Sequence, residues 1–330
     1  MKKEQVFIGI DVSKATLDVC TLDENGAKHA QISNTTKSIK SYFKKLKKEL
    51  NYVECLVCME NTGQYNWPFY EVLEHLDIKL YVVNALHLKR SMGMVRGKTD
   101  KADALRIADH IKRHHSKYKT YQVPRKQIRA IQCLLALRRR LMRSKKTFLV
   151  PMNELVKINP QMAKLIKTQS KKTILSLTIR IREVEAQIKK LIKEDPKLSE
   201  LQKYITSVPG VGKVVTWNLL VKTNEFKQLY DPRKLACYAG VVPFEYQSGT
   251  SIKRKPRVSN MADKKLKTVL HMASIRAVRL EGELRDYYLR KTGNGKNKMS
   301  VLNAVRNKIL ARVCAAVNNQ RVYQKHLVLS

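Results

Sequence analysis

The segment VFIGIDVSKATLDVCTLDENG, residues Val6 to Gly26, decides the fold of the first part of the chain. It opens with a short apolar run, VFIGI, that ends at Asp11. A second run, Thr16 to Leu22, follows, and an Asn-Gly pair separates it from a third run, His29 to Ile32. Short apolar runs divided by turn residues are typical of strands, so the segment predicts a three-strand meander.

Helical and strand patterns alternate after the meander. An amphipathic helix is predicted at Ser38–Leu50, because its apolar residues fall on one side and its lysines on the other. The further expected elements are a strand at Cys55–Met59, a helix at Tyr65–Leu76, a strand at Leu80–Val83 and a helix from Asp100 to about His115, capped by Thr99. This is the element order of an α/β RNase H-like domain, which we assign to residues 1–120.

Four acidic residues stand at the ends of these elements. Asp11 and Glu60 each follow a strand, and Asp100 and Asp103 lie three apart at a helix start, hence on one helical face. Singly, each is more readily explained as a turn or cap residue, but together they are expected to meet at one edge of the sheet. Massed carboxylates repel one another, yet they supply the oxygen ligands that hard cations need. We therefore expect two Mg²⁺ ions, with Mn²⁺ able to substitute, about 4 Å apart for in-line phosphoryl displacement.

The rest of the chain is strongly basic. The sequence holds 66 Lys and Arg against 27 Asp and Glu, a formal charge of +39. Residues 1–110 contribute 17 basic and 14 acidic side chains, so a net charge of +36 falls on the last 220 residues. This asymmetry predicts a nearly neutral unit that keeps its own acids, joined to a unit that binds a polyanion through its phosphates. A generally basic ribosomal-type protein would show no such division.

Two long basic helices are expected within residues 121–200, from Arg125 to about Leu149 and from Lys171 to Glu194, with breaks around Pro151 and Pro160. Apolar residues recur at spacings of three and four in the second helix, at Ile174, Leu177, Ile181, Val184, Ile188 and Leu191. This heptad seam is compatible with a helical hairpin that packs on itself, and equally with a coiled coil that also joins protomers.

A mostly α-helical domain is predicted for residues 201–330, and one of its turns has a composition suited to phosphate contact. Residues 207–215 (SVPGVGKVV) place Gly210 and Gly212 in a tight turn before Lys213. The turn is similar to the hairpin of helix-hairpin-helix modules, whose backbone N–H groups approach phosphates. A simple turn between helices would need the same residues.

A serine beside a basic run is the second feature of this domain. Ser248 opens a Ser-Gly-Thr-Ser segment, and the basic residues that follow it are Lys253, Arg254, Lys255 and Arg257. Basic side chains next to a hydroxyl would hold a scissile phosphate beside a nucleophile. From spacing alone, a serine-rich turn with a solvated charge run is the more economical interpretation.

Three segments resemble the signature of the DEDD-type insertion-sequence transposases, the insertion-sequence one-ten family that includes the Piv/MooV invertases. They are GIDVSKATLDV from Gly9, MENTGQY from Met59 and RGKTDKADALRIA from Arg96, and the resemblance continues through the C-terminal half. It implies that the four acidic positions, Asp11, Glu60, Asp100 and Asp103, hold Mg²⁺ in a RuvC-like domain.

The resemblance also implies a role for Ser248, because these transposases carry a required serine in a Ser-Gly context that is thought to attack DNA covalently. Ser251 is the alternative position. Relatives often show a Gly-Asn pair after the basic loop, whereas residues 261–263 here read Met-Ala-Asp, so this chain departs from the pattern there. Family members further use an element-encoded structured RNA, which implies a guide RNA as partner.

The predicted function is a transposase or recombinase of an insertion element that acts on donor and target DNA. One alternative is a RuvC-like junction-resolving endonuclease, which needs the four acids but not Ser248. Another is a noncatalytic basic nucleic-acid-binding protein. A homodimer or tetramer is expected, because two duplexes must be handled together. Since no apolar run of about 18 residues occurs, we expect no membrane contact and a cytoplasmic, nucleoid-associated protein.

Overall fold

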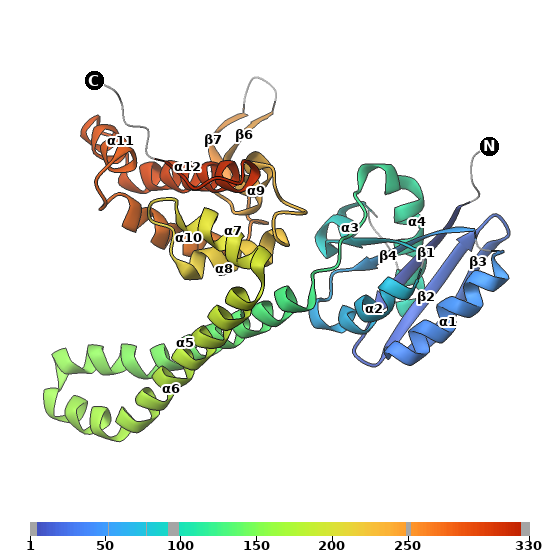
Figure 1. Cartoon of the computed structure of the whole chain (residues 1–330), viewed down its shortest axis with the longest axis horizontal. Coiled ribbons are helices and arrows are strands. Elements are labelled where there is room, and N and C mark those ends of the chain that lie inside the picture. Colours follow the sequence, from blue (N-terminus) through green and yellow to red (C-terminus); the bar gives the residue numbers. More distant parts are fainter. Residues whose placement is uncertain (1–4, 52, 77, 92–98, 249–251, 325–330) are drawn as a thin grey trace. The chain divides into compact units, whose positions relative to one another are not determined.

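The computed structural model describes residues 5–51, 53–76, 78–91, 99–248 and 252–324. The chain divides into two compact units, residues 1–123 and 124–330 (Figure 1). Each unit has hydrophobic clusters of its own. The two long helices that the sequence assigns to a region of their own belong to the second unit, together with the C-terminal helices.

A mixed five-stranded sheet forms the centre of the first unit. Its strands are β1 (Gln5–Val12), β2 (Thr16–Asp23), β3 (Gly26–Ser33), β4 (Glu54–Glu60) and β5 (Lys79–Val83), in the spatial order β3-β2-β1-β4-β5. The first three strands are antiparallel neighbours, and β4 and β5 continue the sheet parallel to β1. The predicted meander and the two later strands are therefore all present.

Helices cover both faces of this sheet. On one face, α1 (Thr36–Glu49) and α2 (Trp67–Val72) bury an apolar cluster that includes Phe43 and Phe69. On the other face lies α4 (Asp100–His114), which packs on β1, β2 and β4. The remaining short elements are α3 (Ala85–Ser91) and the 3₁₀ turns η1 (Gly63–Asn66), η2 (Leu73–His75) and η3 (His115–Lys117). The single helix predicted at residues 65–76 is thus a short α-helix between two 3₁₀ turns.

Strand alternation decides which residues face α4. Ile8 and Ile10 of β1 point to the α1 side, so Gly9 and Asp11 point to the α4 side. A Cβ on Gly9 would lie 2.1 Å from the backbone oxygen of Ala104 in α4. Glycine at this position therefore lets the helix backbone rest directly on the strand.

Two long helices, α5 (Lys126–Ile158) and α6 (Pro160–Glu194), open the second unit and pack along each other. Both are longer than predicted. The break predicted around Pro160 is present, because α5 ends at Ile158 and Asn159 caps the start of α6. Pro160 itself occupies the first turn of α6, where no intrahelical N–H partner is required. Pro151 lies inside α5, which continues past it.

The predicted heptad seam of α6 faces inward. Val184 and Ile188 join Ile131 and Leu135 of α5 in one buried cluster, while Ile174 and Leu177 are half-buried. In this chain the seam is used by α5, in agreement with a hairpin that packs on itself. No described helix is both long and apolar enough to cross a membrane.

Six shorter helices complete the second unit: α7 (Pro196–Thr206), α8 (Lys213–Thr223), α9 (Pro232–Tyr238), α10 (Lys264–Ala277), α11 (Glu283–Gly293) and α12 (Lys298–Asn318). They share one core with the inner ends of α5 and α6, and Trp217 is buried in it. A two-stranded hairpin, β6 (Pro243–Ser248) and β7 (Ile252–Val258), was not predicted. The serine and the basic run, which were expected in a loop, lie on its strands. The sequence did not indicate these strands, because residues 252–258 contain too few alternating apolar side chains.

Candidate active site and nucleic-acid interface

Asp11 and Glu60 lie on neighbouring strands at the same edge of the sheet. The parallel register pairs Gly9 with Cys58 and Ile10 with Met59, so Asp11 and Glu60 occupy the next level along the two strands. Glu60 shares the strand face of Cys58, which packs with α4 residues such as Ile107. Both acids therefore lie on the α4 side of the sheet. They lie at the same edge, as the sequence predicted, because the ends of the parallel strands β1 and β4 are side by side.

The N-terminus of α4 brings the other two acids to this side. Thr99 caps the helix by accepting a hydrogen bond from the Ala102 N–H at 3.2 Å. Asp100 and Asp103 occupy the first turn, where negative charge is favoured by the helix dipole. Asp103 also pairs with Arg106 at 2.6 Å. The cap, the dipole and this ion pair give the two acids a structural role in addition to any role in a site.

The charge of the other acids is felt at Asp11. Its pKa is raised from the ordinary 3.8 to about 6. Burial is the largest cause, followed by the negative charges of Asp100, Asp103 and Glu60, and a backbone hydrogen bond at Val12 opposes the shift. All three predicted partners thus lie close enough to disfavour ionisation of Asp11.

The fit of a metal to this group is good in ligand type and incomplete in geometry. Four carboxylates offer the oxygen ligands that Mg²⁺ and Mn²⁺ prefer, and their mutual repulsion is relieved by a cation. Within the described part of the chain, however, no three His, Cys, Asp or Glu side chains are gathered closely enough to form a coordination shell. The acids make a negatively charged patch beside α4 whose side chains would have to close around an ion.

Asp18 is a fifth carboxylate near this patch that the sequence reading missed. It pairs directly with Asp11 across the antiparallel β1–β2 register, and it accepts hydrogen bonds from Gln31 at 3.1 and 3.3 Å. The meander prediction contained the signal, because antiparallel pairing across a short turn places Asp18 opposite Asp11. Its bonds to Gln31 hold it toward β3.

Ser248 is the last residue of β6 and pairs with Ile252 of β7. The intervening residues 249–251, which include the alternative nucleophile Ser251, lie outside the described part of the chain. Three of the predicted basic contacts, Lys253, Arg254 and Lys255, follow along β7, and Arg257 is exposed opposite Phe244. The hairpin thus carries the serine and the basic run on adjacent strands.

The turn between α7 and α8 has the form of a hairpin between helices. Gly210 has a positive φ of 85°, and a Cβ there would lie 2.5 Å from the Ala273 oxygen of α10. Packing alone therefore requires this glycine. Gly212, by contrast, has open space around its Cα, and it precedes Lys213 at the start of α8.

A groove of about 690 Å³ runs along this turn. Residues of α7, the turn and the start of α8 line it, with Lys213 and Arg276 as its cationic side chains. The accessible main chain at Gly212 and the two cationic side chains would suit the binding of nucleic-acid phosphates in this groove. Nothing in the packing requires Gly212 to be glycine, so phosphate access gives that residue a reason that packing does not.

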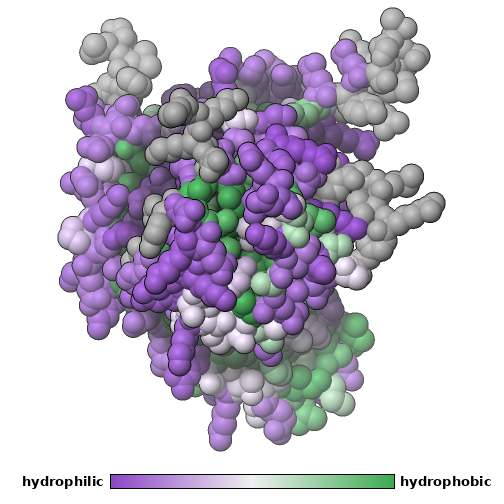
Figure 2. Space-filling view, turned by 90° about the vertical axis from the view of Figure 1, so that its right-hand side faces the viewer, coloured by the Kyte–Doolittle hydropathy of each residue, from purple (hydrophilic) through white to green (hydrophobic). Residues whose placement is uncertain are grey.

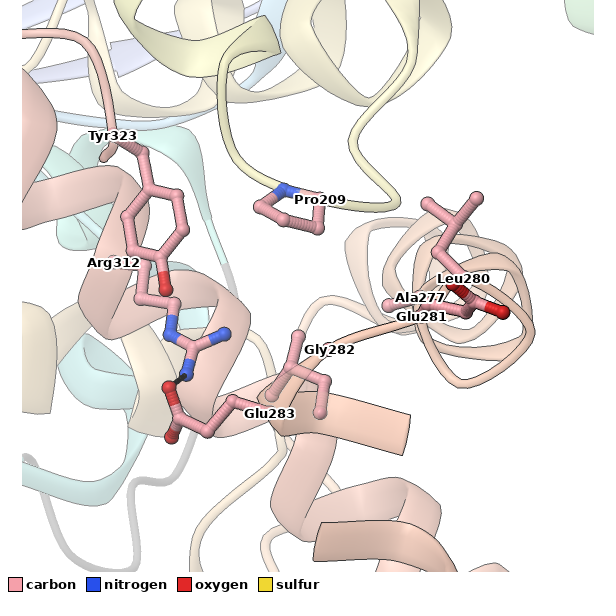
Figure 3. A pocket seen from close by; sticks show the side chains of 9 residues that line it. Pro209, Ala277, Leu280, Glu281, Gly282, Glu283, Arg312 and Tyr323 are labelled. Atoms are coloured by element: carbon pink, nitrogen blue, oxygen red, sulfur yellow. Dashed lines mark hydrogen bonds and ion pairs between the residues drawn. The ribbon is translucent and has the colours of Figure 1, made fainter. Parts of the chain in front are cut away.

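Pro209 also lines a second, smaller cavity of about 100 Å³ (Figure 3). An ion pair between Arg312 and Glu283 borders it, and the Arg312 guanidinium lies 5.2 Å from the ring centre of Tyr323. The Tyr323 N–H donates to Ser207 at 2.8 Å, which fastens the end of the described chain to the turn. The charge of Arg312 is balanced by Glu283, so we assign these side chains a structural role and no ligand.

Figure 2 shows one face of the molecule, which is covered mainly by hydrophilic side chains with apolar ones between them. The cationic side chains of the groove, Lys213 and Arg276, and the basic run of β7 all belong to the second unit.

Family models identify the class of protein that this fold and these acids define. Residues 8–157 match the DEDD transposase model of the IS110 group, described as "Transposase", and residues 202–289 match the "Transposase IS116/IS110/IS902 family". The chain belongs to this family of transposases. The four acids of the first unit fall within the first matched segment, and the helical turn, Ser248 and the basic strand fall within the second.

Individual relatives extend over nearly the whole chain. The "Pilin gene-inverting protein" of Moraxella bovis is 25% identical over 335 residues, covering 98% of this chain and 99% of the relative. The "Transposase for insertion sequence element IS1111A" of Coxiella burnetii is 22% identical over 354 residues, covering 98% and 92%. Among solved structures, T. thermophilus RuvC in complex with a Holliday junction substrate matches 36% of this chain and all of its own, at 12% identity and a TM-score of 0.29.

Proposed function

We propose that this chain recombines an insertion element with target DNA, and that Asp11, Glu60, Asp100 and Asp103 hold Mg²⁺ in an RNase H-like catalytic unit. The observation that supports this most directly is the raised pKa of Asp11, whose causes include all three other acids. Mutual repulsion of this kind is costly unless a cation is bound, so a purely structural role explains it poorly. A bound divalent ion would stabilise the charge that develops on the phosphodiester oxygens.

The proposed nucleophile is Ser248. Its hydroxyl oxygen would form a bond to phosphorus while the bond to the leaving sugar oxygen breaks, and the hydroxyl proton passes to a base or water as the leaving oxygen gains one. The phosphoserine link conserves the energy of the broken phosphodiester bond, so a second strand's hydroxyl can displace the serine and reseal the DNA. Ser251 is the alternative nucleophile.

The basic second unit is proposed to grip donor and target DNA. Lys253, Arg254, Lys255 and Arg257 would contact phosphates beside the serine, while Gly210, Gly212 and Lys213 would contact them at the groove between α7 and α8. The net charge of +36 over the last 220 residues also fits a structured guide RNA, in keeping with the resemblance described above. Duplex DNA alone would account for the same charge.

A homodimer or tetramer is proposed, with its contacts at the outer end of α5 and α6. Because the heptad seam is already covered within the chain, other apolar residues must make the contact. Several large apolar side chains there face solvent, among them Val150, Ile158, Met162, Leu165 and Leu175, and Ile158 is 81% exposed. Exposed apolar side chains gathered on one element favour association with another protein surface.

A strand-joining assay on the Ser248→Ala variant tests the chemistry. We expect DNA binding close to that of the wild type, no covalent protein–DNA adduct and joining reduced by at least about 1000-fold. The matched control is Ser300→Ala, which removes an exposed hydroxyl at the start of α12. Undiminished joining by Ser248→Ala and loss only in a Ser251→Ala variant would move the role to Ser251.

The same assay separates the alternatives. Joining that survives loss of both serines but not Asp11→Asn would favour metal-dependent chemistry alone. Cutting without joining by the wild type would favour a junction-resolving endonuclease. Absence of both cutting and joining in the wild type, with DNA binding that Asp11→Asn leaves unchanged, would leave only a binding protein.

A further inference from the structure

A buried arginine without an acidic partner lies between α10 and α12. Arg306 is 5% exposed, so its guanidinium is almost wholly removed from water. It donates to His271 Nδ1 at 2.7 Å and to Asn303 Oδ1 at 3.3 Å, and its Nε has no hydrogen-bond partner. Burying a guanidinium with only neutral partners costs several kcal/mol in general, so a compensating anion is expected.

More positive charge surrounds Arg306 instead. Lys267 and His271 lie one helical turn apart on α10 and are both half-buried. Burial and, after it, the charge of Arg306 lower the pKa of each, and burial lowers the pKa of Arg306 itself. No carboxylate contributes to any of these three shifts. The cluster therefore holds two cationic side chains, Arg306 and Lys267, with a neutral histidine and an asparagine as the partners of Arg306.

No carboxylate of the described residues pairs with this cluster. Helices α10 and α12 each contain four Lys and Arg residues and no Asp or Glu. Asp263 caps the start of α10, but its carboxylate pairs with Lys222 at 2.6 Å and accepts from Leu266 N–H and the Tyr238 hydroxyl. Among the described residues, Arg306, Lys267 and His271 form no ion pair. The missing negative charge has to come from a ligand.

The cluster also borders the entry to the serine hairpin. Asn303, which accepts from Arg306, donates to the backbone oxygen of Val241 at 2.7 Å, and β6 begins two residues later at Pro243. A Cβ on Gly240 would lie 3.8 Å from the side chain of Lys267, so this lysine packs near the chain that leads into β6. An anion bound here would thus fix the base of the hairpin whose far end carries Ser248.

We propose that Arg306, His271 and Lys267 form a binding subsite for a phosphate group of the nucleic-acid backbone. Because His271 accepts from Arg306 through Nδ1, its proton lies on Nε2 and is available to the phosphate. Lys267 supplies a mobile ammonium at the half-exposed side, and Arg306 supplies fixed charge behind it. The inference rests on the proposed function in one respect, since it takes the anion from nucleic acid.

The subsite positions the substrate and takes no part in bond breaking. Ser248 lies five positions after Pro243, a span of up to about 17 Å along a strand. At a rise of about 3.4 Å per nucleotide, the anchored phosphate lies several nucleotides from the one that Ser248 attacks. Loss of the subsite should therefore raise the DNA concentration needed for half-maximal joining more than it lowers the maximal rate.

The first test measures thermal unfolding of the full chain in inorganic phosphate and in acetate at equal ionic strength, with EDTA present. We expect phosphate to stabilise the wild type more than acetate does, and Lys267→Met to lose that difference. Lys265→Met is the matched control, because it removes an exposed lysine from the same helix and should keep the difference. An equal phosphate response in the wild type and Lys267→Met would overturn the proposal.

The Arg306→Met variant distinguishes a phosphate-binding arginine from one that only stabilises the fold. With the unpaired buried charge replaced by an apolar side chain of similar length, unfolding without phosphate should move to a higher temperature, while the phosphate response disappears. A lower unfolding temperature together with an intact phosphate response would show that Arg306 serves the fold alone. If this variant does not fold, Lys267→Met still decides the question.

The second test connects the subsite to nucleic acid. Binding of a fluorescent DNA duplex in EDTA should weaken at least about fivefold in Lys267→Met at physiological salt, with the slope of log affinity against log salt reduced by about 0.9. Ser300→Ala, which removes only an exposed hydroxyl at the start of α12, should bind like the wild type in this assay. A phosphate response without any change in DNA affinity would reject nucleic acid as the ligand, whereas failure of the recombinase function would appear only in joining assays.

Discussion

Asp11 is the residue on which the acidic patch depends. Asp100 and Asp103 gain stability from the α4 dipole, and Asp103 also from Arg106, so their presence has a structural explanation. Asp11 has none, since its surroundings oppose its charge. A residue that the fold holds in an unfavourable ionised state is a candidate for function.

The first prediction concerns stability. Because the pKa of Asp11 is about 6 in the folded chain and 3.8 as its ordinary value, Asp11 stabilises the fold most below about pH 4 and loses that contribution as pH rises through 6. At pH 7.5 without metal, Asp11→Asn should therefore unfold at a temperature higher by a few degrees, about 1 kcal/mol after solvent screening. Calorimetry checks this, and a clearly destabilised variant would contradict it.

The second prediction concerns divalent ions and pH. At a limiting Mg²⁺ concentration, joining should rise about tenfold per pH unit below pH 6 and level off above it, because a ligand carboxylate must lose its proton before it binds the ion. Added Mg²⁺ or Mn²⁺ should stabilise the wild type but not Asp11→Asn. A flat pH profile between 5 and 7 would count against Asp11 as a ligand.

At the scale of elements, the contact between β1 and α4 determines where two of the four acids lie. The backbone of α4 rests on Gly9, two residues before Asp11, and any larger residue would meet the Ala104 oxygen and the Ala108 nitrogen. The helix start at Asp100 is fixed independently by the Thr99 cap. Depth and register of α4 thus come from one glycine and one threonine.

Gly9→Ala should therefore lift α4 from the sheet. We expect a loss of about 2 kcal/mol in the free energy of unfolding and joining reduced by more than about 100-fold, with DNA binding by the second unit retained. Gly293→Ala is the control, because no atom lies within 4 Å of the added Cβ and its φ is not positive. Wild-type activity in Gly9→Ala would mean that the depth of α4 does not matter for the site.

At the scale of the whole molecule, the two units differ in charge and in the candidate sites that they carry. The first holds nearly balanced charge and the acidic patch, whereas the second carries the excess of basic residues, the serine hairpin and the groove beside α7. The proposed cation site and the proposed phosphate-binding surface are electrostatically opposed. Their separation into two cores allows each to keep its own charge.

Association through the outer end of α5 and α6 is a prediction at this scale. Ile158→Asp with Leu165→Asp should leave unfolding nearly unchanged, since both side chains face solvent, but should lower the oligomer's mass to that of a monomer. Sedimentation with bound DNA provides the measurement. The control pair is Ile174→Asp with Leu177→Asp in the inward seam, which should destabilise the hairpin itself. An unchanged oligomer in the outer pair would exclude this surface.

Much of the first unit follows from sequence, because strand runs, the Asn-Gly turn and the Thr99 cap are local signals. The edge at which Asp11 and Glu60 stand follows from the parallel arrangement of β1 and β4. By contrast, the β6–β7 hairpin was missed, since a run of basic residues without alternating apolar positions gives no strand signal. Arg306 was missed for a related reason: in a helix of mixed apolar and basic residues, nothing local tells which arginine is buried.

The sequence by itself determined the family, the element order of the first unit, the four acidic positions and the division of charge, because these depend on residue type and short-range periodicity. Tertiary structure alone decided that α4 lies directly on Gly9, that the heptad seam of α6 packs against α5, and that Arg306 is buried without a counter-ion. Each of these depends on which surfaces meet across long stretches of chain, and burial and charge compensation exist only once they have met.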